Sequence, residues 1–151
     1  MIPSRAQRRQ SRRLRAALTG TSGFVAFWAF AGAVGLAGGG ADPGSEVTAR
    51  LPFRSPVFAG AALAALVGIP MTATAVLAGR SRSLAGPVGV GSGLLLTGWV
   101  TVQPFIIGRF HWLQPTFGAL GLGTAVLARR VWNEDGPTWL DDVTPPVRYS
   151  R

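Results

Sequence analysis

AALTGTSGFVAFWAFAGAVGLAG, residues 16–38, decides the fold, because none of its side chains is charged. As an α-helix the segment is roughly 34 Å long, enough to cross the ~30 Å hydrocarbon core of a bilayer. Six arginines and no acidic residue precede it within residues 1–15. A basic start before an apolar run is also typical of a secretory or twin-arginine signal, whose apolar region spans only about 7–15 residues. We therefore predict a retained transmembrane helix.

Three more apolar runs follow, at residues 57–78, 84–105 and 108–128. The low share of charged residues, 14% against about 25% in soluble proteins, agrees with a chain whose surface largely faces lipid. We predict an all-α polytopic membrane protein, an antiparallel bundle of four transmembrane helices. A basic arm (residues 1–15) and a polar tail (residues 129–151) flank the bundle.

The first loop is expected to carry a short helix at the membrane surface. Asp42 and Pro43 supply a preferred N-cap residue and a proline at the first helical position. Pro52 ends this segment, and Pro70 is expected to kink the second membrane helix. Thr72 and Thr74 are candidates to satisfy the carbonyl that the proline leaves unbonded.

Orientation follows from the arginines. With the N-terminus inside, twelve of the 15 arginines are cytoplasmic and only Arg50, Arg54 and Arg109 are outside. Cytoplasmic loops carry such an excess of positive charge, so both termini are predicted to be cytoplasmic. Arginine without lysine, together with abundant Ala, Gly and Pro, indicates a GC-rich bacterial genome, and hence a multi-pass protein of a bacterial plasma membrane.

Three short stretches resemble segments of a known group of proteins. They are LPFRSPVF (Leu51–Phe58), VGIPM (Val67–Met71) and WLQP (Trp112–Pro115). They look like those of small uncharacterised four-helix integral membrane proteins of actinobacteria, and the similarity covers about residues 16–130. The resemblance implies the same topology and membrane. The group has no assigned activity, so no site residue is carried over from it.

Small residues recur every fourth position in two of the predicted helices. One row is Gly60, Ala64, Gly68 and Thr72, and the other is Gly89, Gly93, Thr97 and Thr101. Small residues at this spacing let helices approach closely within lipid. Gly60, Gly68, Gly89, Gly93 and Thr97 are therefore predicted to pack helices together. The contact lies either within one bundle or at the seam of a homo-oligomer.

One polar cluster is expected at the outer ends of the third and fourth helices. Its members are Trp99, Gln103, Arg109, His111, Trp112 and Gln114. Arg109 is a candidate to bind an anionic headgroup or carboxylate, with Gln103 and Gln114 as hydrogen-bonding partners. The alternative is a purely structural role, with the two tryptophans as interface anchors and Arg109 reaching water.

The residue types present also bear on whether the protein holds a metal or cofactor or is an enzyme. The chain has no cysteine and one histidine, and its acids lie outside the apolar runs, so we predict neither a metal site nor a cofactor. An enzyme is the least favoured class, because carboxylates and other acid–base groups are missing from the spans. We expect a non-catalytic accessory subunit or a binder of lipid or another small amphipathic ligand. A small oligomeric transporter or channel, with Thr97, Thr101 and Gln103 along the path, is the alternative.

Three further features leave alternatives open. The arginine arm serves as a topology signal or meets anionic lipid headgroups, and nucleic acid is not an expected partner. The segments TAVLAGR (Thr74–Arg80) and TAVLARR (Thr124–Arg130) indicate either a duplicated helical hairpin or a shared way of ending a membrane helix. In the tail, Trp132 and Trp139 belong to a docking peptide for a membrane protein partner or to a segment without a packed core.

Overall fold

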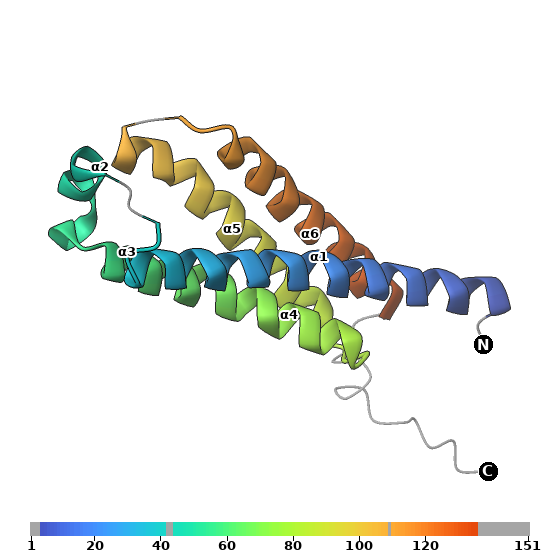
Figure 1. Ribbon diagram of the computed structural model, residues 1–151. Helices are drawn as coiled ribbons and strands as arrows, with labels where there is room; N and C mark the ends of the chain where they lie inside the picture. Colours follow the sequence, from blue (N-terminus) through green and yellow to red (C-terminus); the bar gives the residue numbers. More distant parts are fainter. Residues whose placement is uncertain (1–3, 42–43, 109, 136–151) are drawn as a thin grey trace, which may run out of the picture.

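The computed structural model describes residues 4–41, 44–108 and 110–135, and its regular structure there is entirely helical (Figure 1). Its elements in chain order are α1 (Arg5–Ala37), α2 (Ser45–Arg50), η1 (Pro52–Arg54), α3 (Pro56–Leu63), η2 (Ala64–Gly68), α4 (Ile69–Gly79), α5 (Ala85–Ile107) and α6 (Leu113–Asp135). Within these described residues, three helices are long and apolar enough to cross a membrane: Arg5–Ala37, Pro56–Gly79 and Ala85–Ile106.

Helix α1 begins at Arg5, about three turns before the predicted start at Ala16. A capping box starts it. The Ser4 hydroxyl accepts from the Gln7 backbone N–H at 3.3 Å, and the Gln7 side-chain oxygen accepts from the Ser4 N–H at 2.7 Å. Arginine is a good helix former, so the basic arm joins the apolar run without a break. Gly38 and Gly39 follow, and the φ of 72° at Gly39 ends the helix.

The second apolar run, predicted at residues 57–78, forms one helical stretch with a local change of winding. The Ser55 hydroxyl caps its start by accepting from the Phe58 N–H at 3.2 Å. Segment η2 is a π-helical turn placed just before Pro70, whose ring is incompatible with regular winding. The Thr72 hydroxyl donates to the Gly68 carbonyl at 2.8 Å, and Thr74 donates to the Pro70 carbonyl at 3.0 Å.

The fourth long helix differs from the prediction at both ends. α5 ends at Ile107, where Gly108 caps it with a φ of 72°, and α6 begins only at Leu113, not near residue 108. Its uncharged part therefore runs from Leu113 to Ala128, about 16 residues or roughly 24 Å, which is shorter than the ~30 Å core. The helix then continues beyond Arg129 to Asp135, and Val131 is buried in the bundle. The rest of the predicted tail lies outside the described residues.

The surface helix predicted in the first loop corresponds to α2. It spans Ser45–Arg50, with Gly44 at its N-cap position, while Asp42 and Pro43 lie outside the described residues. A Cβ atom built on Gly108 would collide with the guanidinium of Arg50. The absence of a side chain at Gly108 thus lets α2 lie against the end of α5.

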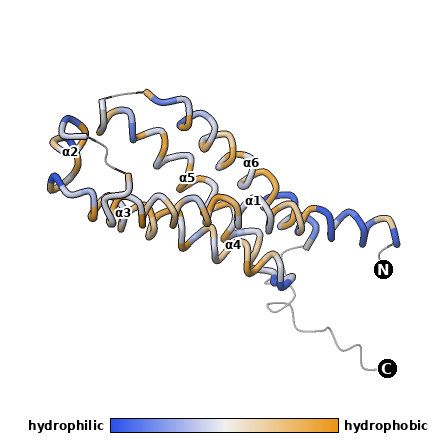
Figure 2. Tube along the Cα trace, in the orientation of Figure 1, coloured by the Kyte–Doolittle hydropathy of each residue, from blue (hydrophilic) through white to orange (hydrophobic). Residues whose placement is uncertain are grey.

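The helices pack side by side along most of their length (Figure 1). α5 and α6 share the most extensive contact, and α1 packs against α3, α4 and α6. One core cluster centres on Val25, Met71 and Leu96, and a second on Leu18 and Ala128. Hydrophilic residues gather at the first turns of α1 and in α2, whereas the middle of the bundle is mostly apolar (Figure 2).

Candidate functional site: an apolar cavity between α1, α5 and α6

A cavity of about 600 Å³ lies between α1, the α3–η2 stretch, α5 and the start of α6. Its body is aliphatic and aromatic, and none of the described side chains that line it is charged. From α1 it receives Phe24, Val25, Trp28, Ala29 and Gly32. Trp28 is 51% exposed, so this wall also meets the surroundings of the bundle. The cavity has the size and apolar lining of a small-molecule site.

A few polar groups converge on this cavity. Gln103, in the last turns of α5, and Gln114, in the first turn of α6, both line it. The ring of Trp99 lines it too, while its buried indole Nε1 has no hydrogen-bond partner among the described residues. A buried donor left unpaired costs roughly 1–3 kcal/mol. The two glutamine amides are therefore the polar groups that the cavity offers to a ligand.

Gln114 has a second role in starting α6. It is only 8% exposed, and its Oε1 accepts from the His111 backbone N–H at 3.1 Å. Its own N–H donates to the His111 carbonyl at 3.0 Å. The imidazole Nδ1 of His111 accepts from the Leu113 N–H at 3.4 Å. These bonds fix the connection between α5 and α6, and with it the cavity's polar end.

The structure brings together four of the six residues that the sequence proposed as a cluster: Trp99, Gln103, Trp112 and Gln114. His111 is exposed, stacks loosely on Trp112 with ring centroids 5.9 Å apart, and does not line the cavity. Arg109 lies outside the described residues.

The sequence did not indicate the contribution of α1. Phe24 and Trp28 stand four residues apart and so share one face of that helix. Their rings lie edge to face, with centroids 6.3 Å apart. The spacing was visible in the sequence, but apolar aromatic residues are common on every face of a membrane helix. Only the position of α5 and α6 singles out this face.

The residues predicted to pack helices lie at helix contacts. A Cβ on Gly60 would come within 2.7 Å of the Ala33 carbonyl oxygen in α1, and one on Gly68 would meet the Phe30 ring at 2.9 Å. A Cβ on Gly89 would be 2.7 Å from that of Ala128. Such spacing leaves no room for larger residues. These contacts lie within one chain.

Gly93 and Thr97 lie where α5 and α6 approach each other closely. A Cβ on Gly93 would stand 2.5 Å from the Gly121 carbonyl oxygen, and one on Gly121 would stand 2.5 Å from the Thr97 Oγ1. Thr97 itself donates to the Gly93 carbonyl at 2.9 Å, so its hydroxyl is satisfied within α5.

Together, the helices and the uncharged cavity define a class: an all-helical protein with helices fit to cross a membrane and an apolar pocket between them. Comparison with known proteins does not narrow this class. No protein-family model, curated protein or solved structure matches the chain.

Proposed function

We propose that the protein is a non-catalytic membrane protein that binds a lipid-like ligand with a long apolar part and a small uncharged polar head. The observation that carries the proposal is the apolar cavity of about 600 Å³, which Gln103 and Gln114 line with amide groups that both donate and accept. The uncharged lining favours a carbonyl or hydroxyl head over a carboxylate or phosphate.

The membrane setting belongs to the same proposal. We infer that all four long helices cross the bilayer as an antiparallel bundle, with α6 short enough for its first turn to sit at the interface. Trp112, 66% exposed just before α6, suits a position at that interface. The arginines at the start of α1 and after α4 support a cytoplasmic location for both termini and a bacterial plasma membrane.

Access to the cavity is proposed to come from the lipid. Phe24 and Trp28 line it and are each about half exposed. A ligand dissolved in the bilayer can therefore enter between α1 and α6 without crossing water, and its head is drawn to the polar end of the cavity. This geometry supports binding from the membrane.

A pair of neighbouring substitutions tests the cavity. Leu96 is buried and lines it, whereas Leu95, next in α5, is about half exposed and does not. Leu96→Trp fills the cavity, and Leu95→Trp adds the same bulk to the outer surface. The measurement is the rise in Tm of the purified protein in mild detergent on adding a monoacylglycerol, because a ligand that binds the folded state raises Tm. We expect the rise to disappear in Leu96→Trp and to persist in Leu95→Trp.

A second substitution tests the polar head. Gln103→Leu removes an amide that lines the cavity and keeps a side chain of similar length, so monoacylglycerol affinity should fall by about 3- to 10-fold, the worth of one hydrogen bond. The matching fatty-acid anion should bind more weakly than the monoacylglycerol in the unaltered protein. Equal responses from the two leucine variants, or no response to any uncharged lipid, would contradict the proposal.

A further inference from the structure

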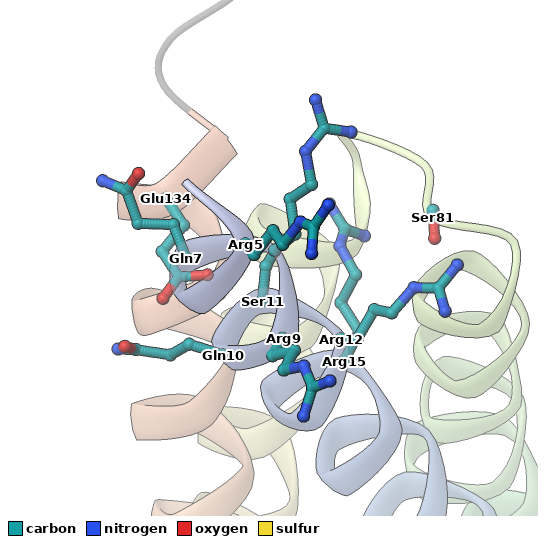
Figure 3. A pocket seen from close by; sticks show the side chains of 10 residues that line it. Arg5, Gln7, Arg9, Gln10, Ser11, Arg12, Arg15, Ser81 and Glu134 are labelled. Atoms are coloured by element: carbon teal, nitrogen blue, oxygen red, sulfur yellow. The ribbon is translucent and has the colours of Figure 1, made fainter. Parts of the chain in front are cut away.

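A second hollow, of about 890 Å³, lies at the opposite end of α1 from the apolar cavity. The first turns of α1, the turn after α4 and the end of α6 enclose it (Figure 3). We call it the arginine groove, after its five cationic residues: Arg5, Arg8, Arg9, Arg12 and Arg15. Glu134 is the acidic residue among its lining, so the groove carries a strong excess of positive charge.

The arginines form one face of the helix. At 100° per residue, the five fall within an arc of about 120°. In Figure 3, Arg12 and Arg15 extend toward the turn that carries Ser81, whereas Gln7 and Gln10 lie on the side of Glu134. The Arg15 Nη1 donates to the Arg82 carbonyl at 3.5 Å, which ties α1 to that turn. Charge is thus concentrated on one side of α1.

The position of the groove along α1, next to the uncharged run, indicates which partner it binds. Arg15 directly precedes the uncharged run 16–38, and Arg12 stands one turn further out. The headgroup layer adds roughly 5–8 Å on each side of the hydrocarbon core, so both residues fall at the level of lipid phosphates. A nucleic acid would have to approach along the membrane surface to reach them. Anionic lipid is already there.

We propose that the arginine groove binds the headgroup of a phospholipid that carries two phosphates. Each phosphodiester has one negative charge, and a guanidinium pairs with it through two parallel N–H···O bonds. Arg12 and Arg15, three residues apart on the same face, can each take one phosphate, while Arg8 lies next in the row. A single phosphodiester carries one negative charge, fewer than the positive charges that line the groove. Basic pockets beside membrane helices suit such headgroups.

The test compares two double variants with the same loss of charge. Arg12→Gln with Arg15→Gln removes the groove's inner arginines, and Arg13→Gln with Arg130→Gln removes two basic residues that do not line it. The full-length protein in detergent is titrated with cardiolipin, phosphatidylglycerol, phosphatidylethanolamine and inorganic pyrophosphate, and bound lipid is counted by native mass spectrometry. A far-ultraviolet circular dichroism spectrum checks that each variant is folded.

We expect the unaltered protein to bind cardiolipin more tightly than phosphatidylglycerol and to bind phosphatidylethanolamine least. The groove variant should lose about 30-fold in cardiolipin affinity, from two surface arginine contacts, and the control variant less than about 3-fold. Equal losses in both variants would mean a general attraction to negative charge and would overturn the proposal. Full displacement of cardiolipin by pyrophosphate, or by a short RNA, would overturn the assignment to lipid.

Discussion

At the scale of single residues, glycine decides how closely the helices approach. Gly93 and Gly91 lie in the same helix two positions apart, but they face different surroundings. A Cβ on Gly93 would stand 2.5 Å from the Gly121 carbonyl oxygen and 2.7 Å from the Ala125 nitrogen, whereas nothing lies within 4 Å of one on Gly91. The two backbones at Gly93 cannot both stay in place if a methyl group is added. The pair is therefore a matched test of packing.

We expect Gly93→Ala to destabilise the protein by about 1–3 kcal/mol, the usual cost of overpacking. Gly91→Ala should be neutral or slightly stabilising, because alanine favours a helix by about 0.5–1 kcal/mol over glycine. Thermal unfolding in a fixed detergent measures both. A lower Tm for Gly91→Ala than for Gly93→Ala would show that α5 and α6 do not meet as described.

Part of the apolar cavity could be predicted from single residues of the sequence. Gln103, Trp112 and Gln114 stand out because they gather where two apolar runs meet, and the structure places all three at one cavity. Phe24 and Trp28 do not stand out, because membrane helices are apolar on every side. Which face of α1 lines a cavity depends on the packing of its neighbours, and no periodicity in α1 encodes that.

At the scale of elements, two similar segments have different surroundings. Thr74 and Thr124 open the repeated TAVLA stretches, and both are fully buried. The Thr124 hydroxyl donates to the Leu120 carbonyl of its own helix at 2.8 Å. The Thr74 hydroxyl also lies 2.9 Å from the Ser92 hydroxyl of α5, which in turn lies 3.0 Å from the Pro70 carbonyl. Only Thr74 connects two helices.

We therefore expect Thr74→Val to cost about 0.6–1.7 kcal/mol, the strength of hydrogen bonds between membrane helices. Thr124→Val should cost much less, because it breaks only a bond within one helix. The Ser92→Ala variant should be destabilised to a similar degree as Thr74→Val, and the double variant should cost less than the sum of the two. Additive losses would contradict a direct bond between α4 and α5.

Element boundaries were predictable only where charge or a cap marks them. The second span starts at Pro56, next to the Ser55 cap and one residue before the predicted start at residue 57, whereas α5 continues past the predicted end at residue 105 to Ile107. The start of α1 was placed too late, because the prediction followed the end of the arginines and gave no weight to the Ser4–Gln7 capping box. The start of α6 was placed too early, at residue 108, whereas the helix begins at Leu113.

At the scale of the whole molecule, arginine placement is the strongest evidence on orientation. The chain has no cysteine, so a single introduced thiol reports one position. Ser45, Ser83 and Phe110 are exposed in the loops and turns between the long helices. We expect a membrane-impermeant maleimide to label Ser45→Cys and Phe110→Cys on intact cells, and to label Ser83→Cys only after the membrane is opened. These results follow if the arginine-rich side is cytoplasmic.

A fourth site, Ser150→Cys, tests whether α6 crosses the bilayer. It should be protected on intact cells together with Ser83→Cys. Labelling of Ser150→Cys from outside would show that α6, whose uncharged part is short, does not span the bilayer. Labelling of Ser83→Cys from outside would invert the whole arrangement.

Helix α1 has 33 residues without an interruption, so it is roughly 50 Å long. Arg12 and Arg15 near its start form one wall of the arginine groove, and Phe24 and Trp28 further along form one wall of the apolar cavity. Between these two walls α1 is an unbroken α-helix with neither a proline nor a π-turn, although the pair Ser22 and Gly23 is a place where a helix can kink. While that pair stays helical, an occupant that fixes the rotational angle of α1 at one end would constrain it at the other. The two proposed occupants would then be coupled, and by thermodynamic reciprocity each would alter the affinity for the other to the same degree.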